Sequence, residues 1–260
     1  AQFENRKAEI TANLKKLMKF LFRRDNFRID YTADEEGYRV LEDSVPDFGA
    51  MLYQEAVEEE PFTFTPQQKN EGFKTSGQVQ YVAVGGNFKK AGYEYTGAHQ
   101  ILRMILSYDY LWNNVRVKGG AYGCMSGFKR TGDAFFVSYR DPHLKKTISV
   151  YEGIPSYLQK FTADERQMTK YIIGTGSGMD MPLTPQGRGN LSFQAYFSGV
   201  TQEQLQKERD EILQAKEEDI RKLADIVEAV LKQNNLCVIG SEAAIEKNED
   251  KFLLVKHLIG

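Results

Sequence analysis

Two polar side chains in a glycine-containing turn are the residues of this sequence best suited to chemistry. Arg116 offers a planar fork of N–H donors that suits a carbonyl or carboxylate, and the phenol of Tyr122 can donate to a developing oxyanion. Gly119 and Gly120 lie between them and allow a close backbone approach or a positive φ, which a branched residue would resist. The spacing predicts an electrophilic clamp made by Arg116 and Tyr122.

The same residues also suit a purely structural role. A Gly-Gly-Ala-Tyr-Gly run, here at 119–123, is typical of an ordinary turn from a helix to a strand with a packed tyrosine. The residue types alone leave both interpretations open.

Predicted elements on both sides position this turn. Apolar residues at helical spacing predict a helix over about 95–114, which ends close to Arg116. Strand-like runs at 122–128 and 134–139 are joined by a polar, glycine-containing connection at 129–133, which is typical of a hairpin. Tyr122 is therefore expected at the start of a strand.

The other predicted elements are helices and strands without a regular alternation. They are helices from Ile10 to Leu21 and at 38–55, strands at 27–31 and 79–84, helices at 144–160 and 162–174, a long helix from about Thr201 to Val230, and a strand at 236–240. The segment 61–77, with Pro61 and Pro66, is interpreted as a loop and not as a domain boundary. Together these elements predict an α+β fold in which helices pack on one side of a mostly antiparallel sheet.

Two features could be mistaken for ligand sites. The glycine-rich residues 174–180 follow a predicted helix and lead into prolines, whereas a nucleotide site needs a strand before and a helix after it, so we expect a mobile connection. The histidines His99, His143 and His257 are scattered, and none has a second histidine at ligand spacing. We therefore expect no metal ligands in this chain.

Composition restricts the class of protein. The 260 residues are 41% apolar, enough for a sizeable core, and we expect one domain over 1–260. Charges of 34 basic and 36 acidic residues argue against a general nucleic-acid or anionic membrane surface. The two cysteines, Cys124 and Cys237, favour a reducing compartment over a disulfide framework. A polar N-terminus and short apolar runs predict neither a signal peptide nor a membrane span.

Several sequence words carry a family resemblance. They are Val79 to Phe88, Leu111 to Gly123, Arg130-Thr131-Gly132, Val137 to Pro142 and Tyr151 to Pro155. In this order they resemble the C-terminal part of the pitrilysin/insulinase family of zinc peptidases, most closely its presequence protease branch. The resemblance covers most of the chain. It implies that residues 1–260 are a single C-terminal α+β domain of a larger peptidase, with a LuxS-like metalloenzyme fold.

The resemblance also implies an activity. In the family, an arginine and a tyrosine from the C-terminal half reach across a closed chamber to the zinc site of the N-terminal half and help bind substrate. Arg116 and Tyr122 match these two positions. The family's inverted His-x-x-Glu-His zinc motif is missing from this sequence. We therefore expect part of a zinc metalloendopeptidase that degrades peptides, inactive alone, with zinc held by the absent N-terminal half.

The expected partners are the N-terminal half of the same polypeptide and unstructured peptides, without nucleic acid or membrane, and Gly119 and Gly120 are expected beside the substrate. A bacterial cytoplasmic protein is expected, or one of an organellar matrix if the parent is eukaryotic. The alternative is a non-catalytic assembly domain, like the inactive core subunits related to the family. The presence of both Arg116 and Tyr122 favours the peptidase.

Overall fold

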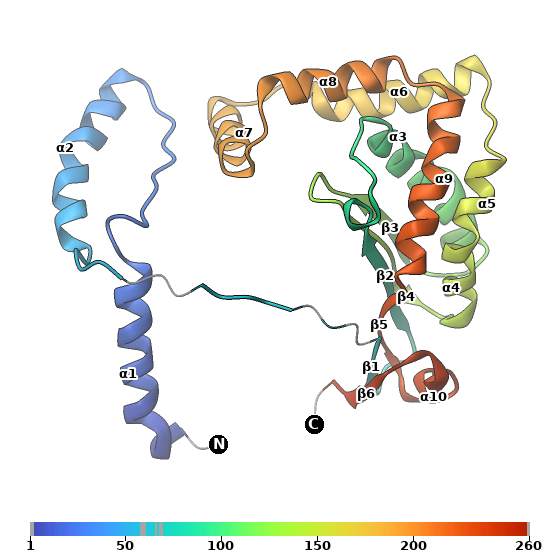
Figure 1. Ribbon diagram of the computed structural model, residues 1–260, viewed down its shortest axis with the longest axis horizontal. Coiled ribbons are helices and arrows are strands. Elements are labelled where there is room, and N and C mark those ends of the chain that lie inside the picture. The colour runs from blue at the N-terminus through green and yellow to red at the C-terminus, as the bar shows by residue number, and fades with distance from the viewer. Residues whose placement is uncertain (1–2, 58–60, 66, 68–69, 259–260) are drawn as a thin grey trace. The chain divides into compact units, whose positions relative to one another are not determined.

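The computed structural model describes residues 3–57, 61–65, 67 and 70–258. Contacts divide the chain into two compact units: unit 1 comprises residues 1–65 and 182–201, and unit 2 comprises residues 66–181 and 202–260 (Figure 1). The units divide inside the segment 61–77, where we expected a loop and no boundary. The prediction that residues 1–260 form one domain of a larger peptidase stays a prediction.

Unit 2 contains a six-stranded mixed sheet. The strands are β1 (Glu71–Thr75), β2 (Gln80–Asn87), β3 (Gly123–Phe128), β4 (Asp133–Asp141), β5 (Asn235–Ser241) and β6 (Leu254–His257), in the spatial order β3-β4-β2-β5-β1-β6. The pairs β3/β4, β4/β2 and β2/β5 are antiparallel, and β1 pairs in parallel with β5 and β6. The predicted α+β class with a mostly antiparallel sheet is confirmed.

Helices cover one face of this sheet (Figure 1). The helices of unit 2 are α3 (Ala98–Ile105), η2 (Leu106–Tyr110), η3 (Trp112–Val117), α4 (Lys145–Glu152), α5 (Ile154–Gln159), α6 (Glu165–Met179), α8 (Gln202–Leu213), α9 (Glu217–Lys232) and α10 (Glu242–Glu246), with short 3-10 turns η1 (Lys89–Ala91) and η4 (Glu249–Lys251). Of these, α6 and α8 pack on α3. Phe136 of β4 and Val227 of α9 are fully buried in the core between the helices and the sheet. Burying such side chains contributes about 1.5–3 kcal/mol each.

Strand alternation leaves the other face of the sheet partly open. Along β4, Phe136 is buried whereas Tyr139 is 43% exposed, and along β2, Val82 is buried whereas Tyr81 is 37% exposed. Successive side chains of a strand point to opposite faces. The aromatic residues Tyr81 and Tyr139 therefore lie on the face opposite the core helices.

Two of the long predicted helices are divided. The helix expected at 144–160 is α4 followed by α5, because Pro155 at the start of α5 has no N–H to continue the first helix. The long helix expected from Thr201 is α8 followed by α9, and Asp219 caps the new helix by accepting from the backbone N–H of Lys216 at 3.1 Å. The apolar period continues across both breaks, which explains the wrong prediction.

The glycine-rich residues 174–180 do not form the mobile connection that we expected. Gly174, Gly176 and Gly178 belong to α6, which continues to Met179. A Cβ added to Gly174 would lie 3.3 Å from the terminal methyl of Met104, so this glycine brings α6 close to α3. Packing against α3 outweighs the low helix propensity of glycine.

The described residues of unit 1 form three helices, α1 (Phe3–Leu21), α2 (Glu35–Met51) and α7 (Pro185–Ser198). The strand expected at 27–31 is absent, because the β contact described in this unit is an isolated bridge between Arg23 and Tyr53 and offers no partner strand. No apolar side chain is buried among the described residues of unit 1.

Candidate functional site

The turn that carries Arg116 and Tyr122 needs both of its central glycines. Gly120 has φ +80°, in the left-handed region that favours glycine. A Cβ at Gly119 would lie 2.4 Å from the backbone oxygen of Val115, so that position needs a residue without a side chain. The backbone N–H of Gly120 donates to the oxygen of Arg116 at 3.0 Å, and that of Ala121 to Val115 at 3.1 Å. These bonds end the helix and reverse the chain.

The helix that leads into the turn is wound as a π-helix. The segments η2 and η3 cover almost all of 106–117, and the N–H of Lys118 donates to the oxygen of Asn113, five residues earlier, at 3.0 Å. The sequence correctly predicts a helix here but not its winding. Short π-helical segments often occur at functional sites. In this chain the winding places Arg116 in the last turn before the glycines.

Contacts on one side hold the Arg116 guanidinium. Its Nη1 donates to the backbone oxygen of Ala121 at 2.9 Å. Its central carbon lies 5.7 Å from the ring centroid of Tyr122 and 5.8 Å from that of Trp112, which is cation–π distance. Its remaining N–H groups have no hydrogen-bond partner among the described residues. The fork is therefore positioned and still able to donate to a ligand.

The Tyr122 side chain is not packed into the protein. It is 68% exposed, and its hydroxyl makes no hydrogen bond to a described residue. The structural alternative of a packed tyrosine does not hold. Arg116 and Tyr122 are thus brought together, with free donors on both, as the clamp requires.

An irregular strand end in β4 holds the backbone of Tyr122. The backbone N–H of Tyr122 lies within hydrogen-bond distance of the oxygens of Tyr139, at 3.1 Å, and Arg140, at 3.3 Å, and Arg140 has φ +48°. The next residue, Asp141, is fully buried and accepts from the N–H of His143 at 2.8 Å and the hydroxyl of Thr147 at 2.6 Å. These bonds fix the strand end. Sequence reasoning did not single out Asp141 as part of the site.

Cys124 lies behind the turn, and its environment makes it a poor nucleophile. Burial, with a smaller contribution from Asp141, raises the pKa of its thiol to about 11, although Arg116 opposes this shift. The thiolate is the reactive form of cysteine, so this side chain is a neutral thiol near pH 7. Arg116 and Tyr122 are residues of this turn with unused polar donors among the described residues.

The histidines are placed where no metal could be shared. His99 is buried between the rings of Phe88 and Tyr95, with centroids 5.0 and 5.1 Å away, and burial lowers its pKa to about 4. His143 and His257 are exposed. In the part of the chain that the structure describes, no group of three His, Cys, Asp or Glu residues could hold a metal ion. A zinc site does not fit the described residues.

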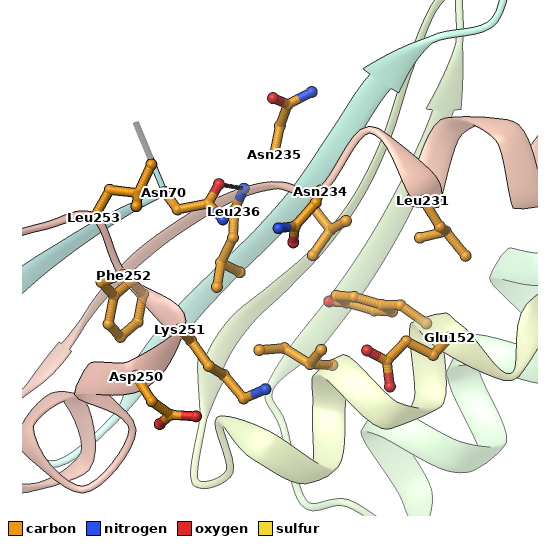
Figure 2. Close-up of a pocket in the computed structure, with 13 residues that line it drawn as sticks. Asn70, Glu152, Leu231, Asn234, Asn235, Leu236, Asp250, Lys251, Phe252 and Leu253 are labelled. Atoms are coloured by element: carbon orange, nitrogen blue, oxygen red, sulfur yellow. Dashed lines mark hydrogen bonds between the residues drawn. The ribbon is translucent and has the colours of Figure 1, made fainter. Parts of the chain in front are cut away.

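A separate cavity of about 440 Å³ lies on the helix side of the sheet and includes neither Arg116 nor Tyr122 (Figure 2). It is bordered by α4, β5 and η4, and Asn70 accepts from the backbone N–H of Leu236 at 3.0 Å at its edge. No sequence motif pointed to it, and its polar residues form no recognisable catalytic arrangement.

Over the described residues, no helix combines the length and the hydropathy needed to cross a bilayer.

Comparisons with known proteins identify the family of this chain. Residues 70–242 match the family model described as the PreP C-terminal domain. The protein HypA of Clostridium perfringens is 44% identical over 98% of this chain and 26% of its own length. Presequence protease 1, chloroplastic/mitochondrial, of Arabidopsis thaliana is 31% identical over 91% of this chain and 22% of its own length. The chain thus spans about a quarter of these relatives.

Solved structures share the fold at low sequence identity. Pitrilysin matches with a TM-score of 0.53 and 12% identity over 79% of this chain and 23% of that chain. A peptidase M16 inactive domain from Pseudomonas fluorescens matches with a TM-score of 0.51 and 15% identity over 78% of this chain and 51% of that chain. Together with the family model, which includes the whole Arg116–Tyr122 turn, these findings show that the chain belongs to the presequence protease family and corresponds to its C-terminal domain.

Proposed function

We propose that this chain is the C-terminal, substrate-binding part of a zinc-dependent metalloendopeptidase that degrades peptides. Arg116 and Tyr122 complete an active site whose other residues come from an N-terminal half of the same polypeptide. The observation that carries this proposal is the pair itself: an exposed Tyr122 lies in cation–π contact with a half-buried Arg116, and both keep unused donors. The family model includes the turn that holds them.

Each side chain has a defined task in this proposal. The free N–H groups of Arg116 donate to a substrate carbonyl and orient it. The Tyr122 hydroxyl donates to the oxyanion that develops when that carbonyl is attacked, which stabilises the transition state more than the ground state. Gly120 is exposed and presents only backbone beside the clamp, so a peptide can approach it closely, whereas Gly119 is buried and shapes the turn.

The zinc ion belongs to the absent half in this proposal, because the described residues offer no site for it. When bound there, zinc would supply an activated water at neutral pH. Alone, this chain is expected to be inactive. It binds and orients the peptide but does not generate the nucleophile.

The N-terminal half is the proposed main partner, and unit 1 supports this. Its described residues bury no apolar side chain, so its helices need a covering surface. Unstructured peptides are the proposed substrates, and neither nucleic acid nor membrane is a proposed partner. We propose the bacterial cytoplasm as the compartment, or an organellar matrix for a eukaryotic parent.

One observation favours a second function. The fold is also that of a structure described as a peptidase M16 inactive domain. In this alternative the chain is a non-catalytic domain that serves assembly. An assembly role gives no reason for Arg116 and Tyr122 to keep their donors free at the surface.

The two functions are separated by mixing this chain with a separately produced, zinc-loaded N-terminal half and measuring cleavage of an unstructured peptide. We expect activity only in the mixture, and a kcat about 10²–10³-fold lower with Tyr122→Phe, the loss typical of one oxyanion donor. Circular dichroism checks that the variant is folded. A complex that cleaves equally well with Tyr122→Phe, or a well-formed complex without activity, would favour the assembly domain.

A further inference from the structure

A row of three tyrosines crosses the open face of the sheet, beginning at the proposed clamp. The ring centroids of Tyr122 and Tyr139 are 5.8 Å apart, and those of Tyr139 and Tyr81 are 5.3 Å apart, both in edge-to-face geometry. The residues come from the turn before β3, from β4 and from β2, which are neighbours in the sheet. We call Tyr122, Tyr139 and Tyr81 the aromatic row.

The backbone is shaped to present this row. Gly123 lies opposite Tyr139 in the β3/β4 register, and a Cβ added there would contact the Cβ of Tyr139 at 3.9 Å. A longer side chain at 123 would therefore cover the Tyr139 ring. Tyr81 lies where the β2/β4 register shifts, between Gln80 and Val82. Bulges of this kind re-aim side chains and often occur beside active sites.

Two other tyrosines of unit 2 contribute directly to the fold. Tyr110 donates to the oxygen of Val150 at 2.8 Å, and Tyr151 is fully buried. In contrast, the row is exposed by 68%, 43% and 37% at Tyr122, Tyr139 and Tyr81. None of these three hydroxyls makes a hydrogen bond to a described residue. The row carries aromatic surface that the fold itself does not use.

The spacing of the row fits an extended peptide. A strand rises about 3.3 Å per residue, so the two centroid separations together match about three residues of substrate. Aromatic faces and edges bind aromatic and large aliphatic side chains. The cation of Arg116 at the start of the row disfavours a basic side chain at that end.

We propose that the aromatic row is a specificity subsite that binds aromatic or large aliphatic side chains of the substrate next to the cleaved bond. This inference rests on the proposed peptidase function, and it adds Tyr139 and Tyr81 to the substrate-binding residues. The clamp holds the carbonyl while the row selects neighbouring side chains.

The test uses the reconstituted enzyme and pairs of unstructured peptides that differ only in phenylalanine or serine at one position near the cleaved bond. The measured quantity is the ratio of kcat/KM between the two peptides of a pair. For at least one position, Tyr139→Ala and Tyr81→Ala should lower this ratio about 3- to 10-fold, as expected for loss of an aromatic contact. Tyr139→Phe keeps the ring and should keep the ratio.

The matched control is Tyr108→Ala, because Tyr108 is also 68% exposed but lies in η2 without a ring contact to the row. Its ratio should equal that of the wild type. If the row variants change the ratio no more than Tyr108→Ala at every position, the subsite is wrong. If they weaken association of the two halves instead, the row is an interface. Tyr122→Phe, measured through kcat, tests the clamp separately, so either proposal can fail alone.

Discussion

Contacts with neighbouring residues fix the direction of the Arg116 side chain. Its bond to the Ala121 oxygen exists because Gly119 and Gly120 return the chain toward η3, and the rings of Trp112 and Tyr122 flank the guanidinium. A lysine here would keep the charge but lose the planar fork and its stacking. The geometry of the site therefore depends on the whole turn. Gly119 is the residue whose substitution should disturb that geometry most.

Gly119→Ala should destabilise the chain by about 2 kcal/mol or more, because the new Cβ would lie 2.4 Å from a backbone oxygen that cannot easily move. Urea unfolding of the 260-residue chain measures this effect. The matched control is Gly176→Ala in α6, where nothing lies within 4 Å of the added Cβ. That change should be neutral or stabilise by about 0.5–1 kcal/mol. Equal effects would contradict the turn geometry.

His99 should make stability fall in acid. Burial lowers its folded-state pKa to about 4, whereas an unfolded histidine titrates near 6.5, so the folded state favours the neutral ring. Its contribution is complete above about pH 6.5 and is lost as the pH falls toward 4. The shift corresponds to roughly 3 kcal/mol. Unfolding of wild type and His99→Gln between pH 7 and 4.5 should show a smaller acid loss in the variant, whereas exposed His143→Gln should follow the wild type.

Residue types predicted the clamp but could not show its exposure. Arginine, tyrosine and two glycines at this spacing indicate an electrophilic clamp, but the same sequence is equally compatible with a structural turn that packs its tyrosine. Tyr122 remains 68% exposed although Arg116 and Tyr139 contact its ring. The role of Asp141 could not be predicted from the local sequence either. Its hydrogen bonds to His143 and Thr147 depend on how the end of β4 packs against α4.

At the scale of elements, the hairpin β3/β4 is tied to α8 by a partly buried ion pair. Arg130 in the hairpin loop donates through Nε and Nη2 to both carboxylate oxygens of Glu208, each at 2.6 Å, and it lies 5.8 Å from the Tyr95 ring. The Glu208 side chain is only 9% exposed. This contact fixes the end of the strands whose other end carries Tyr122.

Arg130→Ala should cost about 3 kcal/mol of unfolding free energy, because it leaves the Glu208 carboxylate buried without its partner. The control is Arg209→Ala, because Arg209 follows Glu208 in α8. Its bidentate pair with Asp180 is 39% and 53% exposed, so its loss should cost less than about 1 kcal/mol. Similar losses for both variants in urea unfolding would show that the Arg130 pair is as solvated as the surface pair.

The β3/β4 hairpin and β5 could be predicted because their sequences show both the strand-like runs and the polar or glycine residues that end them. The division between α8 and α9 was not, because apolar spacing continues from Ile212 to Ile220 while the backbone turns at Lys216. The helical end of α6 was hidden for the opposite reason. Its glycines argue locally against a helix, and only contact with Met104 of α3 makes the close approach favourable.

At the scale of the whole molecule, the two units differ in how they are stabilised. Unit 2 has a core that runs from the sheet into α3, α5 and α9. In unit 1, large apolar side chains are exposed by about half or more along α1 and in α7, including Leu14, Leu17, Leu21, Leu191 and Phe197. Stability requires apolar burial that exceeds the entropy cost of ordering the chain. Unit 2 can meet this requirement alone, whereas the described part of unit 1 cannot.

Hydrogen exchange of the isolated chain should therefore separate the units. Amides of α3, α9 and β2 should be protected, and amides of α1, α2 and α7 should exchange close to the rate of an unfolded chain. Adding the N-terminal half should protect unit 1 and reduce binding of an apolar dye, because the exposed apolar side chains of α1 and α7 would be covered.

Leu17→Asp and Arg6→Asp both introduce an aspartate on α1, the first among its exposed apolar side chains and the second at a residue with 57% side-chain exposure that pairs with Glu9. Leu17→Asp should weaken association with the N-terminal half at least tenfold, since burying an unpaired carboxylate costs several kcal/mol, whereas Arg6→Asp should change it little. Strong protection of unit 1 in the isolated chain would mean that its helices are stable without a partner. The exposed apolar side chains of α1 and α7 would then have to serve another contact.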